Sequence, residues 1–207
     1  MAAFNRKERD RLLRQSDILN AAERVFATKG YHKATIQDIA KEAQYAVGTI
    51  YLYFKDREVL YLDLIERKIA DLISEVKKEV NKTEDAKEKI KVLVHRQLAY
   101  FEENQDFFRI YFSERGGLRW AIKDKISKSA VDKFVKYLDY ITELLKRAQE
   151  KLLIRKELET KRLAYVLASM LNAVIIPWLK GTHKKEQITN MTDFILDIFF
   201  KGVEQKQ

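Results

Sequence analysis

The chain contains no cysteine, one proline and six glycines among 207 residues, and it has no long uninterrupted apolar run. Without cysteine it can form neither a disulfide framework nor a thiolate metal site. The scarcity of glycine and proline, together with the lack of β-type alternation, favours long helices over strands. Because no apolar run is long enough to span a bilayer and the charged N-terminus has no signal-like apolar stretch, we expect a cytoplasmic protein.

Sequence signatures of catalysis are also missing. The three histidines, His32, His95 and His183, lie far apart and lack the spacing of metal ligands. There is no nucleophile elbow, no P-loop and no dinucleotide-binding glycine pattern. We therefore expect no catalytic residues, no metal site and no cofactor, and we expect that the protein is not an enzyme.

The overall charge is positive, with a formal net charge of +9 and a pI near 9.5. A basic balance favours a polyanionic partner such as nucleic acid, although solvated lysine-rich faces are the usual cause. The most basic stretch lies at the start of the chain and contains Arg6, Lys7, Arg9, Arg11 and Arg14. This stretch could lie along phosphates or enter a minor groove. It could equally be the solvated start of the first helix, and the sequence leaves both open.

Residues 35–54 carry the most informative pattern, two short helical segments about one turn apart. The first has an apolar stripe with helical spacing, formed by Ile36, Ile39, Ala40 and Ala43. Thr35 precedes this stripe and Asp38 follows three residues later, which predicts a capping box. The second segment buries Ile50 and Phe54, four residues apart. Two helices joined by a short turn predict a helix-turn-helix, whose second helix reads the major groove through its first residues.

The second helix begins with small residues, which would let it approach base edges closely. Val47 and the Thr49 methyl group can touch a thymine methyl group, and the Thr49 hydroxyl can bond a base or a phosphate. Gly48 lies between them. The residues that follow suit phosphate oxygens by hydroxyl or by charge, namely Tyr51, Tyr53, Lys55 and Arg57. Taken alone, each tyrosine is also typical of an ordinary half-buried aromatic residue.

These residues belong to a longer stretch, 18–60, that resembles the N-terminal domain of the TetR family of transcriptional regulators. The resemblance rests on I-L-N-A-A-E-R-V-F-A-T-K-G-Y-H-K-A-T-I-Q-D-I-A-K-E-A and on V-G-T-I-Y-L-Y-F-K-D-R-E-V-L. It implies DNA contacts at Thr35, Gln37, Thr49, Tyr51, Tyr53, Lys55 and Arg57. With Val47 and Gly48 from the start of the second helix, these residues form the predicted DNA-binding set.

One departure from the family pattern lies in the turn. The family usually has Gly-Val-Ser where this chain has Gln44-Tyr45-Ala46. Glycine would serve as a left-handed cap and serine as an N-cap. We therefore expect Gln44 to end its helix under some strain and the second helix to lack a hydroxyl cap.

The rest of the chain has a helical pattern throughout, so the predicted fold is all-α with about nine helices. The expected helices outside residues 35–54 cover residues 9–29, 56–80, 83–103, 107–115, 118–153, 157–180 and 185–204, and Gly30 ends the first. We predict a three-helix DNA-binding domain over residues 1–55. A larger helical bundle for ligand binding and dimerisation follows over residues 56–207, and the helix at 56–80 links the two.

The last two predicted helices carry apolar faces that must be buried somewhere. The resemblance implies that they pair with the same helices of a second subunit, and a twofold dimer suits a helix-turn-helix that reads two half-sites. The predicted interface residues are Leu163, Leu167, Met170, Val174, Trp178, Phe194, Ile195 and Ile198. The alternative is that both faces close the core of a single chain.

Aromatic residues gather around an expected helix break at Asn104. Apolar pockets between bundle helices are common small-molecule sites, so the candidate ligand-binding residues are Tyr100, Phe108, Tyr111, Phe112 and Trp120. The same spacing is typical of plain core. His95, Arg96 and Arg109 could pair with an anionic ligand or face solvent. The resemblance implies an effector in this domain, and we expect a hydrophobic or amphipathic one, of the acyl-chain type.

Two functions of different class therefore stand. The first is a ligand-responsive transcriptional regulator, by family precedent a repressor, that binds a palindromic double-stranded operator as a homodimer and is released by a small effector. It has no membrane partner. The second is a helical small-molecule carrier or a membrane-surface protein without sequence-specific DNA binding, whose basic faces meet anionic lipid.

Overall fold

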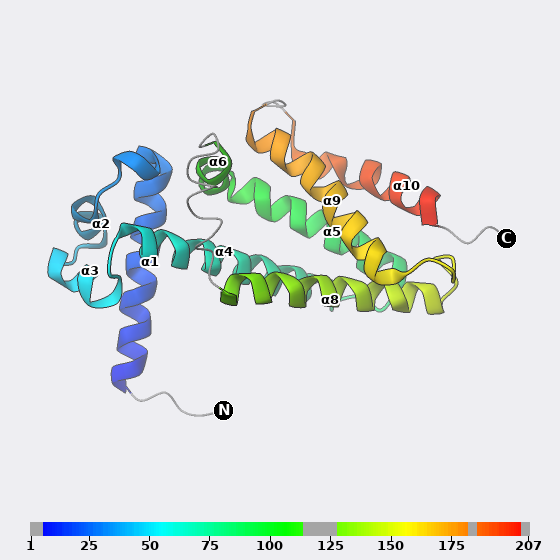
Figure 1. Ribbon diagram of the computed structural model, residues 1–207, viewed down its shortest axis with the longest axis horizontal. Helices are drawn as coiled ribbons and strands as arrows, with labels where there is room; N and C mark the ends of the chain where they lie inside the picture. The colour runs from blue at the N-terminus through cyan, green and yellow to red at the C-terminus, as the bar shows by residue number, and fades with distance from the viewer. Residues whose placement is uncertain (1–5, 114–127, 182–185, 204–207) are drawn as a thin grey trace.

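The computed structural model describes residues 6–113, 128–181 and 186–203, and these residues contain helices and no strands. The elements are α1 (Arg6–Lys33), α2 (Ile36–Ala43), α3 (Val47–Tyr53), α4 (Arg57–Val80), α5 (Ala86–Glu103), α6 (Gln105–Ser113), α8 (Lys128–Glu150), α9 (Thr160–Leu179), the 3-10 turn η1 (Ile188–Met191) and α10 (Thr192–Val203). Figure 1 shows α1, α2 and α3 as a head at one end of the molecule, while the later helices form a body along its long axis. The predicted all-α architecture is confirmed.

The head is held together by one apolar face of α1. Ile18, Ala22 and Phe26 on this face are fully buried, as their spacing predicts. Gly30 ends the straight part of α1, because it has φ 73° and ψ 164°, a backbone conformation that other residues rarely adopt. The chain then turns, and Tyr31 packs its ring against Phe26 at a centroid distance of 5.8 Å.

Helix α4 belongs to the head and to the body. The Asp56 side chain accepts a hydrogen bond from the Val59 N–H at 2.8 Å and so caps the start of the helix. Further along, the Tyr61 ring lies 5.0 Å from Phe26 of α1 and 6.1 Å from Phe107 of α6. The hydrophobic core is therefore continuous across the predicted domain boundary at residues 55 and 56.

A polar link joins the same two parts. The Lys68 ammonium of α4, only 8% exposed, lies 2.6 Å from the Glu23 carboxylate of α1 and donates to the Asn104 side chain at 2.7 Å. The Tyr100 hydroxyl donates to the Lys68 carbonyl at 3.0 Å. One buried cation thus connects the head, α4 and the junction between α5 and α6.

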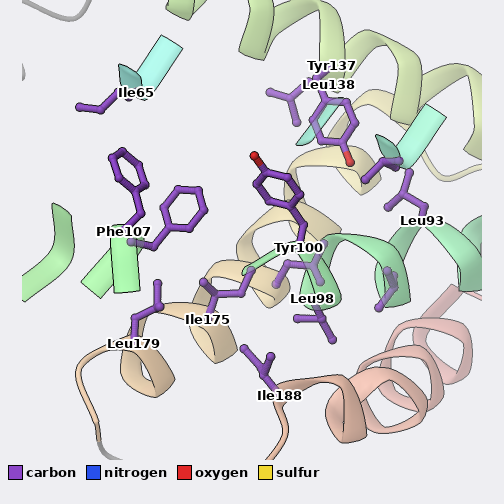
Figure 2. Packing of buried hydrophobic residues seen from close by; sticks show 14 of the residues in the cluster. Ile65, Leu93, Leu98, Tyr100, Phe107, Tyr137, Leu138, Ile175, Leu179 and Ile188 are labelled. Carbon is purple, nitrogen blue, oxygen red and sulfur yellow. The ribbon is translucent and has the colours of Figure 1, made fainter. Parts of the chain in front are cut away.

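Helix α5 is the centre of the body and contacts α4, α6, α8, α9, η1 and α10. Figure 2 shows Leu93, Leu98 and Tyr100 among buried residues contributed by these neighbouring helices. Inside this core the Tyr137 hydroxyl of α8 donates to the Gln97 side chain at 2.8 Å, so that a buried polar pair is satisfied. Burial raises the pKa of the Tyr137 phenol, which keeps it neutral.

Helix α9 is long and apolar enough to cross a membrane by length and composition alone, with a mean hydropathy of 1.5 over its most apolar window. In the structure it packs on α8, α6 and α5, which is the position of a core helix in a bundle. Only 39% of that window is buried. The outer side of α9 therefore presents apolar surface that no described part of the chain covers.

Candidate nucleic-acid interface

Helix α2 begins with the predicted capping box. The Asp38 N–H donates to the Thr35 hydroxyl oxygen at 3.1 Å, and the Thr35 N–H donates to the Asp38 carboxylate at 3.1 Å. Lys29 of α1 donates to the same carboxylate at 2.6 Å. The Lys29 and Thr35 hydrogen bonds lower the pKa of the Asp38 carboxyl group. The box is therefore complete at neutral pH and weakens only as the pH falls through this lowered pKa.

The turn between α2 and α3 has the geometry expected from its unusual sequence. Gln44 adopts φ 58° and ψ 35°, the left-handed conformation that usually belongs to glycine. Ala46 occupies the N-cap position of α3 and provides no side-chain hydrogen bond. Tyr45 supplies a contact that the sequence did not predict, because its hydroxyl donates to the Asp17 carboxylate of α1 at 3.1 Å. This bond ties the turn to α1.

Helix α3 divides cleanly into an inner and an outer side. Ile50 and Phe54 are fully buried against the head, as predicted from their spacing. Gly48, Tyr51 and Lys55 are exposed, and Val47, Thr49 and Tyr53 are half-buried. The exposed Thr35 and Gln37 lie at the start of α2. Most of the predicted DNA-binding residues thus lie on the outer part of α2 and α3, although Val47 and Tyr53 also pack against the core. Lys55 follows α3, and Arg57 is the first residue of α4.

Gly48 has no structural reason to be glycine within the chain, because a Cβ atom added there would meet nothing within 4 Å. Alanine is the better helix former, so Gly48→Ala should raise the free energy of unfolding by about 0.5–1 kcal/mol. On a helix that enters the major groove, the same methyl group would obstruct approach to the bases, and we expect a severalfold loss of operator affinity. Urea unfolding and a duplex-binding titration measure the two effects.

Gly202 of α10 provides a matched control for this substitution. It is also a helical glycine with nothing within 4 Å of an added Cβ atom, and it lies outside the head. Gly202→Ala should raise stability in the same way and leave DNA binding unchanged. If Gly48→Ala binds the operator as tightly as the original chain, then Gly48 does not approach the DNA.

Arg57 has a structural role that its charge alone did not reveal. Its guanidinium donates to the Ala34 carbonyl at 2.7 Å and to the His32 carbonyl at 3.2 Å. It also lies 4.5 Å from the centroid of the Tyr31 ring. Arg57 therefore secures the segment between α1 and α2, and any contact it makes with DNA would use its remaining N–H groups.

Leu52 is a surface residue that was missing from the predicted set. It is 80% exposed, although it is apolar and lies on α3. Gly48 precedes it by four residues, so both lie on one side of the helix. An exposed leucine beside the positions expected to meet bases is a candidate for contact with a thymine methyl group. Helical spacing counted forward from Gly48 would have identified it.

The predicted effector residues lie only partly within the described residues. Tyr100 and Phe108 are 2% and 8% exposed and pack with Phe101 and Phe107, so they belong to the core as described. Tyr111 and Phe112 lie in the last turn of α6, where side chains are outside the description, and Trp120 lies outside the described residues altogether. The aromatic residues do cluster, but in the described part of the chain their side chains pack against one another.

The basic residues considered for an anionic ligand have other partners. Arg96 forms two 2.8 Å hydrogen bonds with the Glu103 carboxylate and a further one with Glu75, so its charge is matched within the chain. These carboxylates raise the pKa of the Arg96 guanidinium. His95 lies 3.3 Å from the Thr192 hydroxyl. Arg109 lies over the Trp178 ring at 5.9 Å.

The predicted dimer interface needs a correction. Leu163, Leu167, Trp178 and Ile195 are at most 8% exposed and close the core of the same chain, so they offer almost no area to a partner. Met170 and Val174 are partly buried. The outer apolar surface, termed here the α9–α10 face, consists of Phe194 and Ile198 from the predicted set together with Tyr165 and Val166, each 48% to 56% exposed. Because α9 is apolar on most sides, its periodicity did not separate the inner face from the outer one.

Two family models match this chain. Residues 18–64 match the model of bacterial regulatory proteins of the tetR family, and residues 83–203 match that of the tetracyclin repressor-like C-terminal domain. The second match alone covers more than half of the chain. The first match covers α1 from residue 18 onward, α2, α3 and the beginning of α4, and the second covers most of the body.

Individual relatives agree with these matches. The chain is 22% identical to the fatty acid metabolism regulator protein of Bacillus subtilis over 189 residues, which covers 91% of this chain and 95% of that protein. The fatty acid degradation regulator FadR of Bacillus halodurans superposes with a TM-score of 0.76 at 24% identity, covering 93% of this chain and 97% of that one. FadR of Bacillus subtilis in complex with stearoyl-CoA gives 0.75 at 20% identity, covering 91% and 99%. These relatives are regulators and not enzymes, and this chain belongs to the TetR family of transcriptional regulators.

Proposed function

We propose that this chain is a ligand-responsive repressor that binds a palindromic operator as a homodimer and is released from it by an acyl-chain effector. The observation that carries the proposal is the division of α3 into a buried side, with Ile50 and Phe54, and an outer side, with Gly48 and Tyr51. A helix so divided can lie in a major groove while the rest of the head supports it from behind.

Dimerisation is supported by the α9–α10 face. Its residues Tyr165, Val166, Phe194 and Ile198 are large, apolar and about half exposed on neighbouring helices. Apolar patches of this kind mark interfaces in soluble proteins. A twofold axis through this face would pair two heads, as a palindromic operator requires. Such a regulator works in the cytoplasm, where the chromosome is.

Phe194→Glu is expected to weaken the dimer at least tenfold, because it places a charge in an apolar interface. Phe194 is 56% exposed in the single chain, so its subunit should fold normally. Sedimentation over a range of concentrations measures the dissociation constant. Phe134→Glu is the matched control, since Phe134 of α8 is 47% exposed and lies outside this face. If the Phe194→Glu variant stays dimeric, the dimer interface does not include the α9–α10 face.

An acyl-chain effector is supported by two observations. Relatives that match over nearly the whole chain are fatty acid regulators, and one was solved with stearoyl-CoA. The body also contains an aromatic cluster around Tyr100, whose hydroxyl bonds the Lys68 backbone, and the Lys68 side chain contacts Glu23 of the head. An effector that binds the released state better than the DNA-bound state would shift the population between them.

The test begins with selection of duplexes by the chain from random DNA, followed by titration of the recovered duplex and a scrambled one across a salt series. The proposal predicts preference for the recovered duplex, affinity that falls as salt rises, and release on addition of stearoyl-CoA. If the selection recovers no duplex, the chain has no operator from which an effector could release it, and the proposal of a DNA-binding regulator is rejected. Stearoyl-CoA binding in the absence of duplex binding would support a carrier instead.

A further inference from the structure

The first turns of α1 extend beyond the core of the head. Every residue from Arg6 to Arg14 is exposed, and burial begins only at Ile18 and Leu19. Figure 1 shows this end of α1 projecting past α3 and α4. Arg, Lys, Glu and Leu are strong helix formers, and the stretch has no glycine or proline, so propensity continues the helix beyond the core. We refer to residues 6–14 as the arm.

One face of the arm is basic. Lys7, Arg11 and Arg14 follow one another at intervals of four and three residues, so they lie on the same side of the helix. Arg6 and Arg9 add charge, against Glu8 and Asp10. A stripe of cations on an exposed helix complements a row of phosphates. The arm gains no stability from burial in the core, and a polyanion bound along the stripe would stabilise it.

The stripe leads directly to the start of α3. Asp17 follows Arg14 by three residues on the same side of α1, and its carboxylate accepts the Tyr45 hydroxyl bond from the turn that precedes α3. Partial desolvation and the Asp17 carboxylate raise the pKa of the Tyr45 phenol, while the nearby Arg14 guanidinium opposes this effect. Because Arg14 lies one helical turn before Asp17, the base of the arm lies beside the turn that precedes α3.

From this geometry we infer that the arm is a second DNA-binding surface, whose basic stripe binds backbone phosphates flanking the bases read by α3. The inference rests on the proposed operator binding. From Asp17 to Arg6 the helix rises about 16 Å, which is the length of roughly five base pairs of B-DNA. The arm contacts no base, so it adds affinity and salt dependence without sequence preference.

The experiment compares Lys7→Gln/Arg11→Gln with the original chain on two duplexes. One duplex ends at the outermost selected base, and the other carries about six further base pairs of arbitrary sequence on each side. The original chain should bind the long duplex more tightly. In the variant this advantage should disappear, with about tenfold weaker binding to the long duplex and a salt slope lower by about one for each phosphate that is no longer neutralised.

Lys146→Gln/Lys151→Gln is the matched control. It removes two exposed cations near the end of α8, far from the head in Figure 1. It should retain the preference for the long duplex and the original salt slope. Because residues 7 and 11 are exposed, neither urea stability nor dimerisation should change in the arm variant.

Two results overturn the inference while leaving the proposed function intact. The first is an arm variant with the original salt slope on a long duplex that the unmodified chain binds specifically. The second is an arm variant that binds DNA as the original chain does but no longer binds phosphatidylserine vesicles that the original chain binds. That result would mean that the arm contacts membranes. An original chain that selects no duplex at all would instead reject the proposed function.

Discussion

Tyr51→Ala is expected to weaken operator binding by about ten- to a hundredfold, the cost of losing a hydrogen bond to a charged phosphate and its surrounding contacts. Tyr51 is 51% exposed on α3 and its ring is not part of the head core. The substitution should therefore leave the helix content, the dimer and the free energy of unfolding nearly unchanged. Fluorescence anisotropy with the selected duplex, beside urea unfolding, measures both quantities.

Tyr51→Phe separates the hydroxyl from the ring. If the hydroxyl binds a phosphate, the phenylalanine variant should lose most of the affinity that the alanine variant loses. It should also bind the scrambled duplex more weakly, because a phosphate contact does not depend on base sequence. An alanine variant with unchanged operator affinity would remove Tyr51 from the interface and would count strongly against α3 as the reading helix.

Glu23→Ala is expected to lower the free energy of unfolding by about 3 kcal/mol, because it removes the carboxylate that lies 2.6 Å from the buried Lys68 ammonium and 3.4 Å from the Arg67 guanidinium. Lys68 is 8% exposed. In the variant its ammonium would keep the 2.7 Å hydrogen bond to the Asn104 side-chain oxygen, but this oxygen is uncharged and does not replace the carboxylate. The Glu23 side chain is 27% exposed, which places the expected cost at the lower end for a buried pair. Urea unfolding provides the measurement.

A second substitution tests whether the unpaired charge causes the loss. Adding Lys68→Met to Glu23→Ala removes the cation and should recover part of the stability, since replacing both members of a buried pair by apolar groups is often nearly neutral. Glu23→Gln keeps an acceptor oxygen and should cost less than alanine. A loss below about 1 kcal/mol in Glu23→Ala would mean that the pair behaves as a solvent-screened surface bridge.

Local features of the head could be predicted because they depend on short-range rules. The capping box at Thr35 and Asp38 follows from neighbouring residues alone, whereas the strained end of α2 at Gln44 and the missing cap at Ala46 were expected from comparison with the family's usual turn. The burial of Ile50 and Phe54 follows from helical periodicity. Several helix boundaries were misplaced by a few residues; for example, the helix expected from residue 83 begins at Ala86, because the Asp85 side chain caps it.

Features that depend on distant parts of the chain could not be predicted. Nothing in the sequence near Arg57 indicates that two carbonyl groups 23 and 25 residues earlier would bind its guanidinium. The ion pair of Lys68 with Glu23 and the engagement of Arg96 by two carboxylates are likewise products of tertiary packing. For Leu163 and Ile195 the apolar character was correct, but only the packed structure shows which face meets the chain's own core.

The central position of α5 has a consequence for the order in which the chain folds. Glu102 accepts the hydroxyl bond of Thr189, 87 residues later, and His95 contacts Thr192, 97 residues later. The contacts among α1, α2 and α3 lie within a short stretch and can form early during synthesis, whereas α5 stays partly uncovered until η1 and α10 have emerged. At the elongation rates of ribosomes this is an interval of several seconds. During this time the nascent body exposes the apolar side of α5, and we expect a chaperone that binds exposed apolar segments to bind the growing chain there.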